Sequence, residues 1–331
     1  MDNTIIYVIV GIFVLMYIID KKAIVKPTVE KLEEGPTKVL TFEEKKIKRR
    51  NEIYKDILQT VQDINPLKTY RVWTYIEIPN ESKNIQLSYT KYSIPIYFRK
   101  CIDMMKQVIP ELIILTPLNI KEYLPDFDIE MKKESILPLK FRTDFLFASI
   151  LKEYGGLCIS PGAIVYDVSS ALSLLHKYDI VTFGSNPSIL NSYNHIYFPN
   201  TYIIGSQKGS QIIKEYYRLL LLRKKDKFQF NLNNKSSEDI LSQLLSEQKP
   251  TQYHFGTEYD GTYNSKHQMI SLDKYMGTSD IDFLSKDKLM VISIPYDILL
   301  ESTKYKWFMN LSEVQFLDSN LIVKRLLFKD I

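Results

Sequence analysis

The sequence predicts an α/β layered domain that follows an N-terminal transmembrane helix. Two observations give this prediction: segments with strand and helix character alternate from Tyr70 onward, and residues 4–19 form an uncharged, almost wholly apolar run. Such alternation is typical of a sheet covered by helices. The chain has 331 residues, 45% of them hydrophobic, which is enough for a large core. We expect an anchor at 1–22, a polar spacer and stalk helix at 23–66, and the α/β domain at 67–331.

The apolar run is interpreted as a signal-anchor that stays in the mature chain. As a helix, residues 4–19 reach roughly 24 Å, slightly below the usual span, and the flanking lysines can extend toward the interface. A cleaved signal peptide is the alternative, but the region before the apolar core is acidic and no A-x-A-like site follows. Lys21, Lys22 and Lys26 follow the run, so the positive-inside rule places the large domain in the cytosol of a single-pass protein.

The elements that follow can be placed in order. A spacer with Pro27, Gly35 and Pro36 leads to a polar helix that begins at the capping box of Thr41 and Glu44. Strands are expected at 71–78, 112–116, 157–160, 163–166, 179–183 and 201–204. Helices are expected at 95–108, 120–124, 140–154, 170–176, 210–222 and 237–247. The polar stretch 224–236 is expected to be a surface loop, and the apolar segments 304–308 and 321–328 to pack back on the domain.

Composition excludes several function classes. The 43 basic and 39 acidic residues nearly balance, and the basic run 45–50 follows Glu43 and Glu44, so we expect a solvated helix face and no nucleic-acid partner. Two cysteines, Cys101 and Cys158, cannot form a disulfide framework or a cysteine-rich zinc site. The signatures of dinucleotide-binding and P-loop proteins are absent from the sequence.

The helix expected at 140–154 is buried, yet it carries a carboxylate on its apolar side. At about 100° per residue, Asp144 lies beside Phe147, Ala148 and Leu151. An unpaired carboxylate there is costly, so Asp144 is expected to have a partner or a ligand. Gly155 and Gly156 follow the last periodic residue, where a helix end favours positive φ. A helix, a glycine end and a hairpin of 157–159 with 163–166 explain everything except Asp144.

The stretch 141–167 resembles the central motif SDxxRxxxLxxYGGxYxDxD of the capsular polysaccharide synthesis and glycosyltransferase family 32 group. The matching positions are Asp144, Leu151, Tyr154, Gly155 and Gly156. The family arginine falls on Phe147, and its two metal-binding aspartates fall on Ser160 and Gly162. Weaker similarity covers about 70–307. The resemblance implies a GT-A-like nucleotide-sugar-binding domain with a mixed, mostly parallel central sheet.

Two functions follow from this resemblance. The first is a membrane-anchored glycosyltransferase, a hexosyltransferase of the retaining type, that moves a sugar from a nucleotide-sugar donor to a glycan or glycolipid acceptor. The second is a degenerate relative that serves as a binding or scaffold protein at a membrane, supported by the loss of both DxD carboxylates. That loss also argues against the Mn or Mg cofactor of the family. The persistence of Asp144 and the double glycine slightly favours transfer. A structural membrane protein that only resembles the family is a third interpretation.

The expected site residues come from three places. Trp73 and Tyr75 end the first strand, where a ligand base can stack on them, although core packing is the commoner role of strand aromatics. The loop from His254 to Gly261 mixes glycines with titratable groups, with a solvated turn as the alternative. The expected donor-binding residues are Trp73, Tyr75, Arg142, Asp144, Gly155, Gly156, Ser160, Gly162 and Lys266. The expected catalytic residues are Asp144, His254 and Asp260, and Asp167 is a candidate metal ligand. Lys266, Arg142 or a metal recruited by Asp167 would supply the positive charge that the missing carboxylates no longer recruit.

Overall fold

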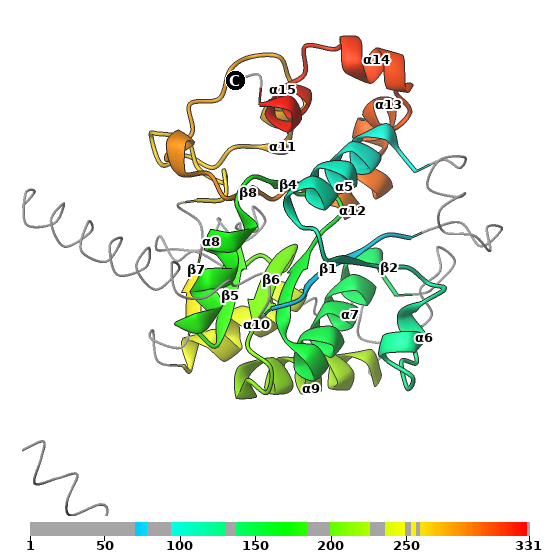
Figure 1. Ribbon diagram of the computed structural model, residues 1–331, viewed down its shortest axis with the longest axis vertical. Helices are drawn as coiled ribbons and strands as arrows, with labels where there is room; N and C mark the ends of the chain where they lie inside the picture. The colour runs from blue at the N-terminus through cyan, green and yellow to red at the C-terminus, as the bar shows by residue number, and fades with distance from the viewer. Residues whose placement is uncertain are drawn as a thin grey trace, which may run out of the picture. The chain divides into compact units, whose positions relative to one another are not determined.

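A computed structural model describes residues 70–77, 94–129, 137–183, 199–225, 236–248, 253–255 and 259–329 (Figure 1). For 225 and 253–255 it describes the backbone. All of these residues fall within the compact unit Lys55–Ile331. The predicted anchor, spacer and stalk helix lie outside the described residues. Within the described ranges no helix combines the length and apolar character needed to cross a membrane.

The centre of this unit is a six-stranded mixed sheet with the strand order β2-β1-β3-β6-β5-β7. Its strands are β1 (Val72–Tyr75), β2 (Leu112–Leu115), β3 (Gly156–Ile159), β5 (Ile180–Phe183), β6 (Ile203–Ser206) and β7 (Tyr253–Phe255). β6 runs antiparallel to both of its neighbours, β3 and β5, and the other neighbouring pairs are parallel. The α/β class and the mixed, mostly parallel sheet are therefore confirmed.

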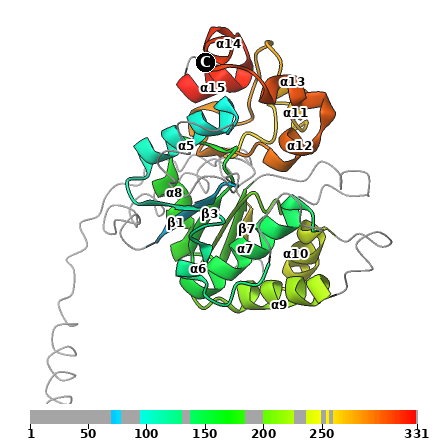
Figure 2. The same ribbon diagram turned by 90° about the vertical axis from the view of Figure 1, so that its right-hand side faces the viewer.

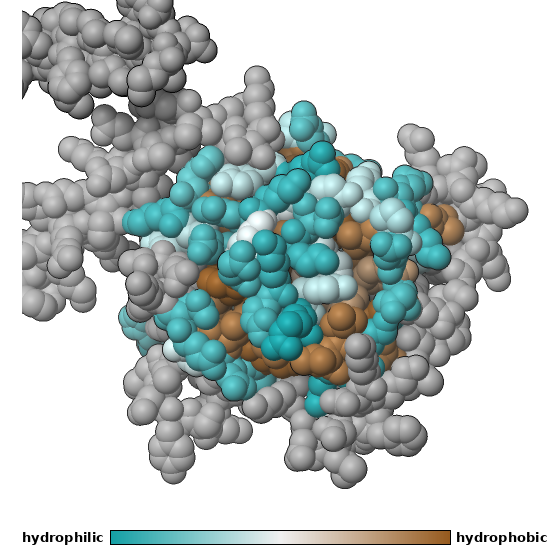
Figure 3. All heavy atoms as spheres, turned by 90° about the horizontal axis from the view of Figure 1, so that it is seen from below, coloured by the Kyte–Doolittle hydropathy of each residue, from teal (hydrophilic) through white to brown (hydrophobic). Residues whose placement is uncertain are grey.

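Successive side chains along a strand point to opposite faces of the sheet and so pack into two separate hydrophobic cores. In β1, Val72 points into one core, whereas Trp73 and Tyr75 point into the other. One face is covered by α6 (Ile120–Tyr123), α7 (Leu139–Tyr154), α9 (Gln211–Lys225) and α10 (Ser237–Ser246). The opposite face is covered by α5 (Ile96–Val108), α8 (Val168–Ser173) and the C-terminal helices (Figure 2). The surface seen from below carries both apolar and hydrophilic side chains (Figure 3). Leu222 of α9 is an apolar side chain that is 46% exposed.

The C-terminal region completes the second core. Its helices are α11 (Leu272–Tyr275), α12 (Tyr296–Glu301), α13 (Lys306–Met309), α14 (Glu313–Asp318) and α15 (Ile322–Phe328). Phe308, Phe316 and Leu326 are buried, so the prediction that the closing segments pack back on the domain is confirmed. The hairpin expected after the double glycine is wrong: β4 (Ile164–Val165) pairs antiparallel with β8 (Val291–Ile292), far along the chain, instead of with β3.

The connection between α7 and β3 requires two glycines, because a side chain at either position would collide with the backbone. Gly155 and Gly156 have φ values of 69° and 100°, which side chains disfavour. A Cβ on Gly156 would lie 2.1 Å from the carbonyl oxygen of Arg71, and one on Gly155 would lie 2.5 Å from the backbone nitrogen of Lys208. α7 therefore turns directly into β3 beside β1. Its N-terminal end comes back to the edge of the sheet where β1 and β3 end.

Candidate functional site

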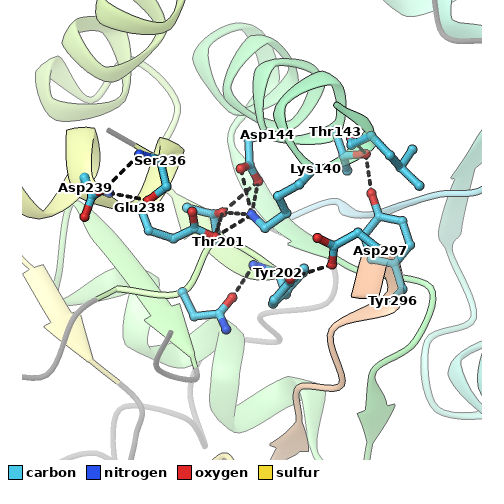
Figure 4. A network of polar contacts seen from close by, with 12 residues as sticks. Lys140, Thr143, Asp144, Thr201, Tyr202, Ser236, Glu238, Asp239, Tyr296 and Asp297 are labelled. Carbon is cyan, nitrogen blue, oxygen red and sulfur yellow. Dashed lines mark hydrogen bonds and ion pairs between the residues drawn. The ribbon is translucent and has the colours of Figure 1, made fainter. Parts of the chain in front are cut away.

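Several chain segments converge at the carboxyl edge of β1 and β3. Because β6 is antiparallel to β3 and Ile203 is paired with Ile159, Thr201 and Tyr202 lie just beyond the end of β3. The Ser160 N–H donates to the Tyr202 carbonyl at 2.7 Å. The first turns of α7, α10 and α12 bring further polar side chains to this edge (Figure 4). In open α/β sheets this edge is the usual place for ligands.

Six side chains form a polar network that we call the α7 cluster: Lys140, Asp144, Thr201, Tyr202, Glu238 and Asp297. At its centre the Lys140 ammonium lies 2.6 Å from both carboxylate oxygens of Asp144 and 2.8 Å from Glu238 Oε1. It also contacts the Thr201 hydroxyl, which donates to Asp144 Oδ1 at 2.7 Å. The partner that the sequence requires for Asp144 is therefore Lys140, one helical turn earlier.

The helix termini fix the outer members of the cluster. Glu238 stands in the first turn of α10, which begins with a capping box between Ser236 and Asp239. On the other side, the Tyr202 hydroxyl donates to Asp297 Oδ1 at 2.5 Å, and the Thr143 hydroxyl is hydrogen-bonded to that of Tyr296. α12 is thus joined to both α7 and the start of β6.

The cluster carries more negative than positive charge, since one ammonium faces three carboxylates. Burial raises the pKa of Asp144 to about 6, although Lys140 acts to lower it. Burial also raises the pKa of Asp297. For Glu238, burial acts to raise the pKa, but Lys140 and several hydrogen bonds outweigh it and the pKa is lowered. Burial acts to lower the pKa of Lys140, and the surrounding carboxylates raise it well above its usual value.

Arg142 and Tyr75 lie beside the cluster without joining it. Arg142 forms an ion pair with Glu77 at 3.1 Å and donates to the Leu137 carbonyl, also at 3.1 Å. Its guanidinium charge is therefore already balanced by a neighbour. The Tyr75 hydroxyl is buried and has no hydrogen-bond partner within the part of the chain that the structure describes. Burial, with a smaller effect from Glu77, raises the pKa of Tyr75.

The two positions of the family's metal-binding aspartates are buried and tightly packed. Ser160 is fully buried, and its hydroxyl accepts from the Gly162 N–H at 3.3 Å. The Gly162 carbonyl accepts from the Tyr97 hydroxyl at 2.8 Å. A Cβ on Gly162 would lie 3.1 Å from the Ile294 carbonyl oxygen and 3.2 Å from Tyr296 Cβ. This turn does not fit a divalent cation, and the described ranges hold no group of three His, Cys, Asp or Glu that could bind one.

Trp73 and Asp167 have structural roles instead of the expected ligand contacts. Trp73 is fully buried, its indole N–H donates to the Gly155 carbonyl at 3.2 Å, and its ring packs against Tyr123 and Tyr154. It therefore cannot stack on a base. The Asp167 carboxylate caps α8 by accepting from the Ser170 N–H at 3.0 Å. That hydrogen bond gives Asp167 a structural role at the start of α8.

The later loop is only partly described. Asp260 is buried and accepts from the Thr262 N–H at 2.9 Å, which is a turn contact, so no catalytic arrangement follows from it. Lys266 is exposed, and its backbone N–H donates to Asn264 Oδ1 at 3.0 Å. His254 lies in β7, paired with Val181, and its side chain is outside the described atoms.

Sequence reasoning missed six residues at this edge of the sheet: Lys140, Thr201, Tyr202, Glu238, Tyr296 and Asp297. Lys140 had a local signal, because a lysine four residues before an aspartate on a helix can form an ion pair with it. The other five reach the edge through tertiary folding. Thr201 and Tyr296 lie 57 and 153 positions from their partners on α7, and Asp297 lies 95 positions from Tyr202. Residues so far apart leave no trace in local periodicity.

Comparison with known proteins agrees with the motif. Residues 92–251 match the family model described as capsular polysaccharide synthesis protein. No curated protein matches the chain. A glycosyltransferase involved in the glycosylation of the major capsid of PBCV-1 is similar in structure, with 10% identity, a TM-score of 0.35, and coverage of 73% of this chain and 100% of that one. The PaToxG glycosyltransferase is similar over 62% of this chain and 80% of its own, with 14% identity and a TM-score of 0.28.

These structural scores are too low to transfer any detail of a site. The family match is the finding that bears on identity, because its range contains α7, the double glycine and the turn at Ser160. α12, which contributes Tyr296 and Asp297, lies beyond it. Residues 92–251 are thus similar to the capsular polysaccharide synthesis family, as the motif around Asp144 predicted.

Proposed function

We propose that this protein is a glycosyltransferase-like protein of GT-A type that binds a neutral sugar at the α7 cluster without a divalent metal. The observation that carries the proposal is the chemistry of the cluster at the carboxyl edge of the sheet. Carboxylates, an ammonium and a threonine hydroxyl lie beside the rings of Tyr202 and Tyr296, whose centroids are 6.1 Å apart. Such convergent polar groups with aromatic neighbours suit sugar hydroxyls and the apolar face of a sugar ring.

The charge of the cluster supports a neutral ligand. Three carboxylates, Asp144, Glu238 and Asp297, surround the single ammonium of Lys140, so the excess charge is negative. Sugar hydroxyls can donate to carboxylates, whereas a phosphate placed against them would be repelled, so the diphosphate of a nucleotide sugar would have to lie outside the α7 cluster. The turn from Ser160 to Gly162 supplies neither carboxylate of a DxD motif, so the diphosphate of a donor lacks its usual metal partner. Sugar recognition is therefore the part of the family chemistry that these residues favour.

Transfer of a hexosyl group, with retention, to a glycan or glycolipid acceptor is the second candidate function. In that reaction the bond from the anomeric carbon to the diphosphate oxygen breaks, a bond to the acceptor oxygen forms, and the acceptor hydroxyl loses its proton. The observation that favours it is Lys140, whose side chain is 15% exposed at the edge where a leaving diphosphate would need positive charge. Lys140 would have to leave Asp144 and Glu238 to serve this role.

Calorimetric titration of the full chain with UDP-glucose, UDP-galactose and GDP-mannose tests both candidates. The proposed function predicts binding of at least one of them, with equal affinity in manganese and in EDTA, and no release of nucleoside diphosphate. Binding that requires manganese would contradict the metal-free site. Absence of binding under both conditions would contradict sugar recognition. Release of nucleoside diphosphate that disappears in Lys140→Met, under conditions where circular dichroism shows this variant to be folded, but not in Lys304→Met, would favour transfer.

We also propose that residues 4–19 anchor the protein in a membrane and that the α/β domain lies in the cytosol. The lysines after the apolar run support this orientation. Asn310 tests it, because it is exposed after α13 and begins an N-x-S sequon. In a eukaryotic host we expect no endoglycosidase-sensitive mass shift. A shift that is lost in Asn310→Gln would place the domain on the luminal side.

A further inference from the structure

The three carboxylates of the α7 cluster differ in how much acceptor capacity they have left. An ionised carboxylate offers about four acceptor positions. Asp144 is 2% exposed, and it accepts from Lys140 with both oxygens and from Thr201 with Oδ1. Glu238 is 3% exposed and is ion-paired with Lys140, with Thr201 also donating to it at 3.3 Å. Both carboxylates are used within the protein and turned away from solvent.

Asp297 is the exception. It is 9% exposed and makes no ion pair within the described ranges, and it accepts from the Tyr202 hydroxyl and from the Ile298 backbone N–H, which leaves part of its acceptor capacity unused. Lys140 is close enough to act on its charge, as is Glu238. Solvent therefore reaches the α7 cluster at Asp297 and at the partly exposed Lys140. A sugar hydroxyl that reaches this edge meets Asp297 as the acceptor with room left.

We infer that Asp297, and not Asp144, is the carboxylate that accepts a sugar hydroxyl, and that α12 determines which neutral sugar binds. The inference rests on the proposed function and names the residue that carries its specificity. Two sugar hydroxyls fit this edge together: one donates to Asp297, and one accepts from the Lys140 ammonium. The Tyr202 ring, 4.5 Å from that ammonium and hydrogen-bonded through its hydroxyl to Asp297, lies between the two.

Asp144 then has a positioning role. With Glu238 it holds Lys140 in place, and Lys140 in turn meets the ligand. α12 lies outside the family match at residues 92–251, so the specificity residue comes from the C-terminal region. The motif that identifies the family and the residue that selects the sugar are therefore on different elements.

Asp297→Asn separates the two roles. The amide oxygen can still accept from Tyr202, so we expect the melting temperature to stay close to that of the parent. Affinity for the nucleotide sugar that the parent binds among UDP-glucose, UDP-galactose and GDP-mannose should fall about tenfold or more, because a charge-assisted hydrogen bond to the ligand is lost. Asp318→Asn, on the exposed end of α14, is the matched control and should bind as the parent does.

A second variant tests specificity itself. Asp297→Glu keeps the charge and moves it by one methylene, so the ratio of affinities for UDP-glucose and UDP-galactose, which differ at a single hydroxyl, should change. This variant also carries the test if Asp297→Asn does not fold. Unchanged affinity in Asp297→Asn, or an unchanged ratio in Asp297→Glu, would overturn the inference while sugar binding by the parent upholds the proposed function. A parent that binds none of the three sugars would overturn both.

Discussion

The two halves of the central motif, before and after the double glycine, are equally buried and chemically opposite. On α7, Asp144 is 2% exposed and ionisable, within a network of charges. In the turn after β3, Ser160 is 0% exposed and Gly162 has no side chain. Burial therefore does not decide whether a carboxylate is present. The available partners do: Asp144 has Lys140 and Thr201, whereas the atoms nearest to a Cβ at Gly162 belong to the Ile294 carbonyl and the side chains of Tyr296 and Phe98, which offer no positive charge.

The double glycine between the halves has a third explanation, which is purely steric. Gly156 is required because a side chain would collide with the Arg71 carbonyl. The motif positions thus have different explanations. Backbone geometry requires the double glycine, ion pairing stabilises Asp144, and the carboxylates are absent at Ser160 and Gly162. The motif alone does not say which of its chemical functions remains. The following predictions test this difference between the halves.

The largest effect is expected for Gly162→Asp. Its Cβ would press on the Ile294 carbonyl at 3.1 Å, and its carboxylate would be buried without a cation. Overpacking and an unpaired charge together should cost roughly 4 kcal/mol or more of unfolding free energy, so we expect insoluble or unfolded protein. Gly209→Asp, where a Cβ meets nothing within 4 Å, should be much milder despite a φ of 85°. If Gly162→Asp proves as stable as the parent in urea, the description of the turn as tightly packed is wrong. Because a side chain at position 162 does not fit this turn, combining Gly162→Asp with Ser160→Asp should not create a manganese site.

The next effect is expected in the charged half. Lys140→Met leaves Asp144 and Glu238 buried without their ammonium, which should destabilise the fold by about 3–5 kcal/mol. Urea denaturation at pH 7.5 measures the loss. Lys304→Met is the control, since Lys304 pairs with Asp273 on the surface, and we expect no measurable change. The double variant Lys140→Met with Asp144→Asn should recover part of the loss. Failure to recover any of it would mean that the charge on Asp144 is not the cause.

The sequence placed the local elements well because their signals are local. The helix expected at 140–154 is α7 at Leu139–Tyr154, and the strand expected at 112–116 is β2 at Leu112–Leu115. β7 and β8 were missed, since they span three and two residues and exist only through pairing with β5 and β4. Strands that short have no periodicity to detect.

The candidate site divides in the same way. That Asp144 needs a partner follows from the helical repeat, and the loss of the metal ligands is read directly at Ser160 and Gly162. Asp297 could not be found, because its position depends on how the C-terminal region folds back onto the sheet. Trp73 was expected to face a ligand, but only the packing against Tyr123 and Tyr154 shows that its ring is enclosed.

The pH dependence of stability tests the role of the charge on Asp144. Burial raises the pKa of Asp144 from its ordinary 3.8 to about 6, so its stabilising contribution is full below pH 3.8 and is lost as the pH rises through about 6. Asp144→Asn lacks this titration. The stability of the parent relative to the variant should therefore fall on the order of 1–3 kcal/mol between pH 4 and about 6.5.

Glu238 should behave with the opposite sign. Its pKa is lowered, so its contribution is present above the ordinary value of 4.5 and is lost as the pH falls. Thermal unfolding of the parent, Asp144→Asn and Glu238→Gln from pH 4 to pH 8 measures both slopes. If the stability difference from the parent changes with pH in the same direction for both variants, the opposite pKa shifts assigned to Asp144 and Glu238 are wrong.

The smallest effect concerns the link between α7 and the C-terminal region. The Thr143 hydroxyl donates to the Leu139 carbonyl at 3.0 Å and is also hydrogen-bonded to the Tyr296 hydroxyl. Tyr296→Phe leaves Thr143 with its backbone partner and keeps the ring, so the loss should be about 1 kcal/mol. A double-mutant cycle with Thr143→Val should give a coupling energy of about 0.5–1.5 kcal/mol, because the two side chains touch. Thr303→Val, on the exposed surface, is the control and should show no coupling to Tyr296→Phe. A coupling near zero between Thr143 and Tyr296 would mean that α12 is held against α7 by apolar packing alone, and the C-terminal region would then contribute Asp297 to the edge without this hydrogen bond to fix its position.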